Sequence, residues 1–198
     1  MPSLTMSKQD VSKYSADNQY ATMMIYVATN DYAAARCCIL NGLFPGFMLA
    51  SEAIEKLLKA AIFLESGEEM KSNHNAFALK EKLKQSKDYG LDKYDDQLNK
   101  LFDHYQSRYH DNPTTGKGAS SEELPQIDAL WLELMEKLPI PDEVKYMTAF
   151  FSHLANPNPF WRNDHWLKFE NQALSPKLDS IRAKYLEIKR HLHPTASA

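Results

Sequence analysis

Glycine is scarce in this chain, with six residues in 198, and long apolar runs are missing. Glycine supplies the backbone conformations of tight turns, so its scarcity argues against a turn-rich β architecture. No window approaches 18 uncharged apolar residues, and the polar N-terminus has no apolar signal-peptide segment. The sequence therefore predicts a cytoplasmic protein with no membrane contact.

Cysteine is also rare, and the chain has no net positive charge. The two cysteines, Cys37 and Cys38, are adjacent, a spacing that offers no disulfide framework, so they fit a reducing compartment. We interpret both as small, buried, apolar residues. The net charge of −3 gives no general attraction to nucleic acid, so any contact with phosphate needs a local basic patch.

What the chain does contain is apolar residues at helical spacing. These stripes predict an all-α protein, an up-and-down antiparallel helical bundle with additional C-terminal helices. We expect a flexible tail at 1–16, the bundle at 17–138 and a helical extension packed on it at 139–198. The expected helices lie at about 15–41 (one long helix or two), 45–66, 74–85, 91–109, 127–138, 144–154 and 178–192. The polar segment 112–121 is the clearest loop.

Strong catalytic and metal motifs are missing. The seven histidines form no HExxH and no zinc-type set with cysteine, so we expect no metal and no cofactor. The loop around Lys117 resembles a phosphate loop, but Asp111 and Gly118 stand where the pattern needs glycine and Ser or Thr. Neither GxSxG nor GxGxxG occurs.

The stretch ASEAIEKLLKAAIFLESG, residues 50–67, places four charges opposite its apolar face: Glu52, Glu55, Lys56 and Lys59. Two Glu-to-Lys pairs with a spacing of four residues each stabilise an exposed helix by about 0.3–0.5 kcal/mol. This pattern favours a ladder of solvent-exposed ion pairs. The alternative is that the four charges form part of a binding surface.

A second cluster, HYQSRYHDNP at 104–113, joins Arg108, Tyr109 and His110 where a helix gives way to a loop. Such a trio can hold a phosphate and stack on a base. A helix C-terminus whose carbonyls attract Arg and His, with the tyrosine in the core, explains it as well. FWRNDHW, at 160–166, allows the same two interpretations.

Several of these stretches occur in the order of a known family. NDYAAARCCILNG, ASEAIEKLLKAAIFLESG, HNAFALKEKL and LFDHYQSRYHD together resemble the HEPN domain, named for higher eukaryotes, prokaryotes and nucleotide binding. The most diagnostic parts are the EKxxKA run that begins at Glu55 and the RY pair at Arg108. The resemblance, over about residues 17–138, implies a helical bundle that pairs as a homodimer. Its members include nucleotide-binding modules, partners of small nucleotidyltransferases in toxin–antitoxin pairs, and metal-independent ribonucleases.

The ribonuclease branch of that family uses an Arg followed four to six residues later by His, and no arginine of this chain has that spacing. Arg162 and His165 are too close together for it. The resemblance therefore implies a non-catalytic module that binds a nucleotide, a nucleic acid or a protein. The alternatives are a divergent ribonuclease and a purely structural dimer. We expect Lys59, Arg108, Tyr109 and His110 to form the ligand site, with Lys59 and Arg108 providing positive charge.

Overall fold

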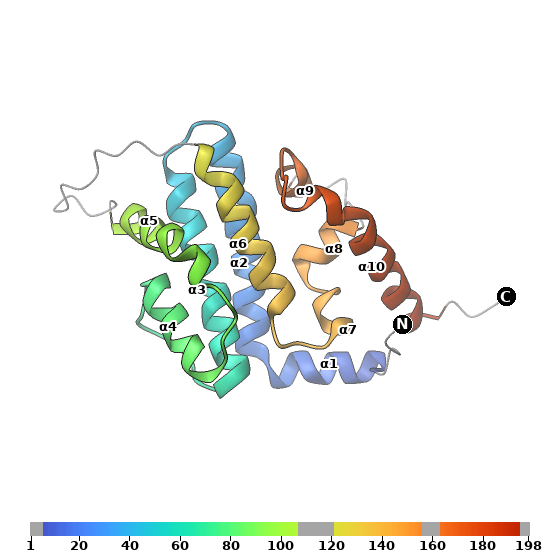
Figure 1. Cartoon of the computed structure of the whole chain (residues 1–198). Coiled ribbons are helices and arrows are strands. Elements are labelled where there is room, and N and C mark those ends of the chain that lie inside the picture. The colour runs from blue at the N-terminus through green and yellow to red at the C-terminus, as the bar shows by residue number, and fades with distance from the viewer. Residues whose placement is uncertain (1–5, 107–120, 156–162, 195–198) are drawn as a thin grey trace.

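A computed structural model describes residues 6–106, 121–155 and 163–194, and all regular structure among them is helical. The predicted all-α fold is confirmed (Figure 1). The helices of the bundle are α2 (Gln19–Leu40), α3 (Pro45–Ser66), α4 (Ala76–Ser86), the short η1 (Asp92–Tyr94), α5 (Asp95–Gln106), η3 (Ser121–Glu123) and α6 (Leu124–Lys137). The remaining helices are α1 (Lys8–Asp17), α7 (Asp142–Lys145), α8 (Ala149–Ala155), α9 (Asn163–Lys168), η4 (Ser175–Lys177) and α10 (Leu178–Leu192).

The antiparallel pair α2 and α3 forms the centre of the fold (Figure 1). Gly42, with φ of 70°, follows the end of α2, and Pro45 starts α3, as the sequence predicts. Gly46 allows the two backbones to approach closely, because a Cβ there would lie 2.8 Å from the Ala35 carbonyl oxygen. The sequence is therefore suited to tight packing of these two helices.

The elements α4, α5 and α6, together with α2, enclose α3 and bury more than half of its residues. Asn75 caps α4, since its side chain accepts a hydrogen bond from the Ala78 N–H. In Figure 1, α4 and α5 lie on one side of α3, and α6 runs along the central pair. Residues of α3 that an isolated helix would expose are consequently enclosed.

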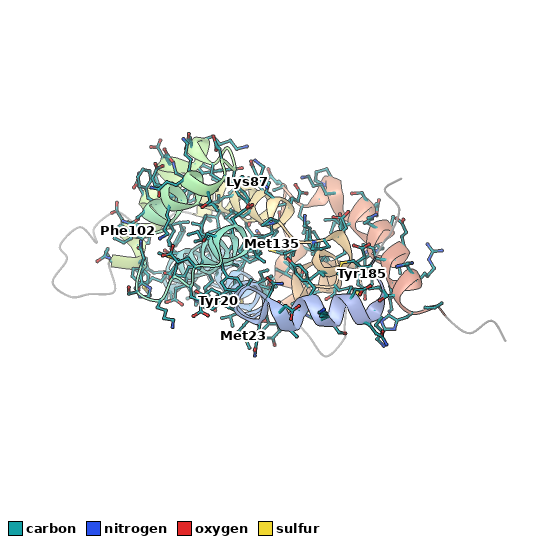
Figure 2. All side chains as sticks on the ribbon, turned by 90° about the horizontal axis from the view of Figure 1, so that it is seen from below. Tyr20, Met23, Lys87, Phe102, Met135 and Tyr185 are labelled. Carbon is teal, nitrogen blue, oxygen red and sulfur yellow. The ribbon has the colours of Figure 1, made fainter. Side chains whose placement is uncertain are left out.

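Residues 8–16 of the expected flexible tail belong to the helix α1. A capping box fixes its start, in which Ser7 and Asp10 exchange side-chain-to-backbone hydrogen bonds. In Figure 2, α1 extends from α2 near Tyr20 and Met23 towards the C-terminal helices near Tyr185. The prediction failed because α1 has no buried residue, and so no apolar stripe reveals it.

The C-terminal helices pack on α2 and share its hydrophobic core. One cluster of buried residues includes Ile25 of α2 together with Phe150 and Phe151 of α8 and Ile181 of α10. The single helix expected at 144–154 is divided into α7 and α8, with a turn at 146–148 between them. The short helix α9 contacts α2 and was not predicted from the sequence.

A buried polar network connects α2, α6, α9 and the segment that follows α9. Arg36 is fully enclosed and forms an ion pair with Asp128, while its Nε donates to the Trp166 carbonyl oxygen at 2.6 Å. The Tyr32 hydroxyl donates to Asp128 Oδ1 at 2.7 Å and accepts from Asn171 Nδ2 at 3.2 Å. Polar contacts thus hold the C-terminal extension to the bundle in addition to apolar packing.

The adjacent cysteines precede the end of α2. Neither forms a disulfide and both are only partly buried, so the interpretation as buried residues is wrong. The reason is geometric: Ala35, Arg36 and Ile39 of the same turn are buried, and the two cysteines lie beside that buried face rather than on it.

Candidate ligand-binding site

The four charges on α3 differ sharply in depth. Glu55 and Lys59 are 5% and 4% exposed, whereas Glu52 and Lys56 are partly exposed. The solvated ladder is therefore wrong for the pair Glu55 and Lys59, because neighbouring helices and the segment before α4 cover this face of α3. Only the pair Glu52 and Lys56, 3.2 Å apart, resembles the expected surface ladder.

This charged face lines an open cavity of about 400 Å³. The cavity lies between α2, α3, α5 and the segment that precedes α4. Its lining consists of Met24, Glu52, Glu55, Lys56, Lys59, His74 and Tyr105. A cavity of this size falls in the range of small-molecule sites in proteins.

Glu55 is the central polar group of the cavity lining. Its Oε1 accepts a hydrogen bond from Lys59 Nζ at 2.7 Å and lies 3.1 Å from His74 Nδ1. Its Oε2 is buried and has no hydrogen-bond partner among the described residues. An unpaired buried carboxylate oxygen is costly, and therefore it indicates a place where a missing donor would be stabilising.

His74 and Tyr105 form an aromatic pair on another wall of the cavity. Their rings are stacked with centroids 5.9 Å apart and an interplanar angle of 14°. His74 is half-exposed and Tyr105 is buried. With Nδ1 directed at a carboxylate, the Nε2 of neutral His74 is a hydrogen-bond acceptor, and protonation converts it to a donor.

The charges of the lining are balanced. The Lys59 ammonium is paired with Glu55, and Lys56 is paired with both Glu52 and Asp31, the latter at 2.7 Å. Burial alone would lower the pKa of Lys56, but its hydrogen bonds to these two carboxylates outweigh burial and raise it. Lys56 therefore remains charged, and its charge is offset by its neighbours.

Of the four residues expected to form the ligand site, only Lys59 lies in the described part of the chain, and it lines the cavity. Arg108, Tyr109 and His110 lie outside the described residues, as does most of the predicted loop 112–121. The structure adds His74 and Tyr105 to the site. Neither had a distinguishing signal, because His74 lies in a non-helical segment and Tyr105 belongs to an ordinary apolar stripe.

The second aromatic cluster, FWRNDHW, is described only in part. Trp161 and Arg162 lie outside the described residues. His165 packs against Trp166 and against Phe169, at centroid distances of 4.9 and 5.1 Å. This packing supports a structural role for the described half of the cluster.

Within the described ranges, no group of three or more His, Cys, Asp or Glu side chains is arranged to hold a metal ion. In the same ranges, no helix combines the length and apolar character needed to span a bilayer.

The comparisons with known proteins identify a family. No curated protein and no solved structure is significantly similar to the chain. The HEPN domain family, in contrast, matches residues 21–144, which is more than half of the chain. The match begins in α2 and ends in α7, so it contains every residue that lines the cavity. This chain belongs to the HEPN domain family.

Proposed function

We propose that this chain is a non-catalytic HEPN module that binds a nucleotide or a segment of RNA in the cavity beside α3. The observation that carries the proposal is the convergence of Lys59, His74 and Tyr105 on one open cavity of about 400 Å³. Aromatic rings stack on bases, and Lys and His side chains donate hydrogen bonds to polar ligand atoms. Members of the HEPN family include nucleotide-binding modules, which supports the same class of ligand for this chain.

The proposed site also includes Arg108, Tyr109 and His110. These residues follow Tyr105 closely in the sequence, and Tyr105 is the contribution of α5 to the cavity. In this proposal Arg108 pairs with a phosphate group and Tyr109 stacks on a base. In this proposal the Arg108 guanidinium supplies the net positive charge that the cavity lining lacks.

Isothermal titration calorimetry with nucleotides and short RNA tests this proposal. Lys59→Ala and Arg108→Ala should each weaken binding, and the effect of Arg108→Ala should shrink as the salt concentration rises. Arg190→Ala, on the distant α10, is the matched control and should bind as the wild type does. Wild-type protein that binds neither nucleotide nor RNA would refute the proposal.

A second function, that of a divergent metal-independent ribonuclease, is favoured by one observation. Glu55 Oε1 lies 3.1 Å from His74 Nδ1, and a carboxylate that orients an imidazole is a common arrangement of a general base. The missing Arg/His spacing argues against it, because no arginine is paired with a histidine as in the nuclease branch. RNA incubated with the protein and a chelator should stay intact. Cleavage that disappears in both His74→Ala and Arg108→Ala would instead establish that the protein is a ribonuclease. Arg162→Ala tests the other candidate pair, Arg162 and His165.

We also propose that the chain forms a homodimer, as the family resemblance implies. Light scattering should then give twice the monomer mass of 22.7 kDa. Exposed Met23 and Tyr26 on α2 provide apolar surface for such contact.

A small nucleotidyltransferase is the proposed protein partner, in the manner of a toxin–antitoxin pair, and purification of the two proteins together tests it. A purely structural dimer would form the same dimer and bind no ligand.

A further inference from the structure

Glu55 has unused hydrogen-bonding capacity in an otherwise paired cavity. Both of its contacts, from Lys59 and His74, are to Oε1, and Oε2 has no partner among the described residues. A carboxylate accepts hydrogen bonds on both oxygens, and it rotates readily about its terminal bond. Because Glu55 lines the cavity, a partial rotation about this bond brings Oε2 within reach of a donor in the cavity while Lys59 keeps its contact with Oε1.

The charge around the cavity determines which part of a nucleotide fits there. Glu52 and Glu55 offset Lys56 and Lys59, and Asp31 adds a further negative charge beside Lys56. The described lining therefore offers no surplus positive charge to a phosphate, and a buried carboxylate repels one. A neutral group that donates a hydrogen bond is favoured instead.

We propose that the cavity receives the base of the nucleotide, and that Glu55 accepts a hydrogen bond from the amino group on that base. The phosphates remain outside the cavity. The inference rests on the proposed function and specifies how its site recognises the ligand. Adenine, guanine and cytosine each carry an exocyclic amino group that satisfies Glu55. Uracil differs from cytosine, and hypoxanthine differs from adenine, by a carbonyl oxygen in place of that group.

The aromatic wall fits the same occupant. His74 is the exposed member of the stacked pair and Tyr105 supports it from within the core, so one flat face is available to a base. His74 also contacts Glu55, which fixes the ring beside the carboxylate. Stacking and amino-group recognition therefore act on neighbouring parts of one ring system.

The decisive experiment measures the affinities of cytidine and uridine. They differ in an amino group against a carbonyl oxygen at one ring position, and in the adjacent ring nitrogen, which accepts in cytidine and donates in uridine. Cytidine should bind at least about tenfold more tightly, because a buried carboxylate left facing a carbonyl oxygen is strongly unfavourable. Adenosine should bind more tightly than inosine for the same reason. Inorganic phosphate should not compete with cytidine.

Glu55→Gln tests the residue itself. The amide of Gln offers a donor as well as an acceptor, so the preference for cytidine should fall to near unity or reverse towards uridine. Glu65→Gln is the matched control on the same helix, because Glu65 contacts Tyr89 and Lys87 outside the cavity. Circular dichroism melts of both variants verify that they are folded.

The outcomes separate the inference from the proposed function. Protein that binds the nucleotide CMP but not cytidine, with phosphate as a competitor, would overturn base recognition while leaving nucleotide binding intact. Equal affinity for cytidine and uridine would also overturn it, as would an unchanged preference in folded Glu55→Gln. Failure of every nucleoside, nucleotide and RNA to bind would refute the proposed function itself.

Discussion

Two buried ion pairs of this protein illustrate two uses of buried charge. In the first, Asp128 uses both oxygens, one for Arg36 and one for the Tyr32 hydroxyl. In the second, Glu55 uses one oxygen for Lys59 and leaves the other without a described partner. The first pair lies in the core between α2 and α6, and the second lines a cavity that opens to solvent.

The difference separates a structural network from a candidate site. Arg36 has carbonyl partners at Trp166 and Phe169 besides Asp128, so the network fixes the C-terminal segment against the bundle. Burial and the adjacent Asp128 carboxylate raise the pKa of Tyr32 well above its usual value, which keeps its hydroxyl protonated as a donor. A fully paired network has no capacity for a ligand, whereas Glu55 does.

Asp128→Asn should have the largest effect. It preserves the shape of the side chain but leaves the enclosed Arg36 guanidinium without a counter-charge, at a cost of about 3–5 kcal/mol. At roughly 3 °C per kcal/mol for a chain of this size, the melting temperature should fall by about 10 °C, measured by circular dichroism. The double variant Arg36→Met with Asp128→Leu removes both charges and should be more stable than Asp128→Asn. A single variant that melts as the wild type does would contradict the structural role of this pair.

Tyr32→Phe should have the next largest effect. It deletes one hydroxyl and thereby removes a donor from Asp128 and an acceptor from Asn171, at a cost of about 1–3 kcal/mol in the free energy of unfolding. Urea denaturation measures that cost. The stack of this ring on Trp131, with centroids 4.2 Å apart, is unchanged by the substitution and serves as the internal control for packing. Loss of near-ultraviolet aromatic signals would show that packing, rather than the hydrogen bonds, had been disturbed.

Glu55→Gln, the isosteric counterpart of Asp128→Asn, should cost less than Asp128→Asn, about 1–2 kcal/mol. It also removes the counter-charge of a buried cation, but the Gln oxygen still accepts from Lys59, and Lys59 lines a cavity that opens to solvent. Parallel urea denaturation of the two isosteric variants measures the contrast. Equal destabilisation would mean that both pairs are structural, which would remove the basis for treating Glu55 as a ligand contact.

The sequence predicts one of these regions better than the other. Residues at its two ends determine the limits of α3: Pro45 lies at its start, and Gly67, with φ of 76°, lies at its end. Both limits were predicted correctly. The depth of Glu55 is not local, because it depends on α5 and on the segment around His74, which fold over α3 from distant parts of the chain. The helical spacing of charged residues predicts that their face of the helix is exposed to solvent. Tertiary contacts decide whether other elements cover that face.

The network of Arg36 was missed for the same reason. Asp128 lies 92 positions away from Arg36 in the chain, and no spacing rule connects the two. The helix α1 was missed on different grounds, since its capping box is local but none of its residues is buried. Local rules therefore recovered the core helices, while buried charge pairs required the folded chain.

Glu133 extends the comparison to a carboxylate that is partly exposed and fully paired. Its substitution should have the smallest effect on stability. It accepts from Lys137 and Lys93, each at 2.6 Å, and from Tyr94 at 2.9 Å. Burial alone would raise the pKa of Glu133, but these three hydrogen bonds outweigh burial and lower it below 4.5. Because its folded-state pKa is depressed, Glu133 contributes stability above pH 4.5 that is lost as the pH falls through the lowered value.

Glu133→Gln should therefore reduce the free energy of unfolding by under about 1 kcal/mol at pH 7, since solvent screens these contacts. The gap between variant and wild type should narrow between pH 5 and pH 3, because the wild-type carboxylate becomes protonated and loses its charge there. Thermal melts of both proteins across this range measure the gap. Since the Gln side chain carries no titratable group, a gap that stays constant down to pH 3 would mean that Glu133 acts through shape and neutral hydrogen bonds. Its ion pairs with Lys137 and Lys93 would then contribute nothing to stability.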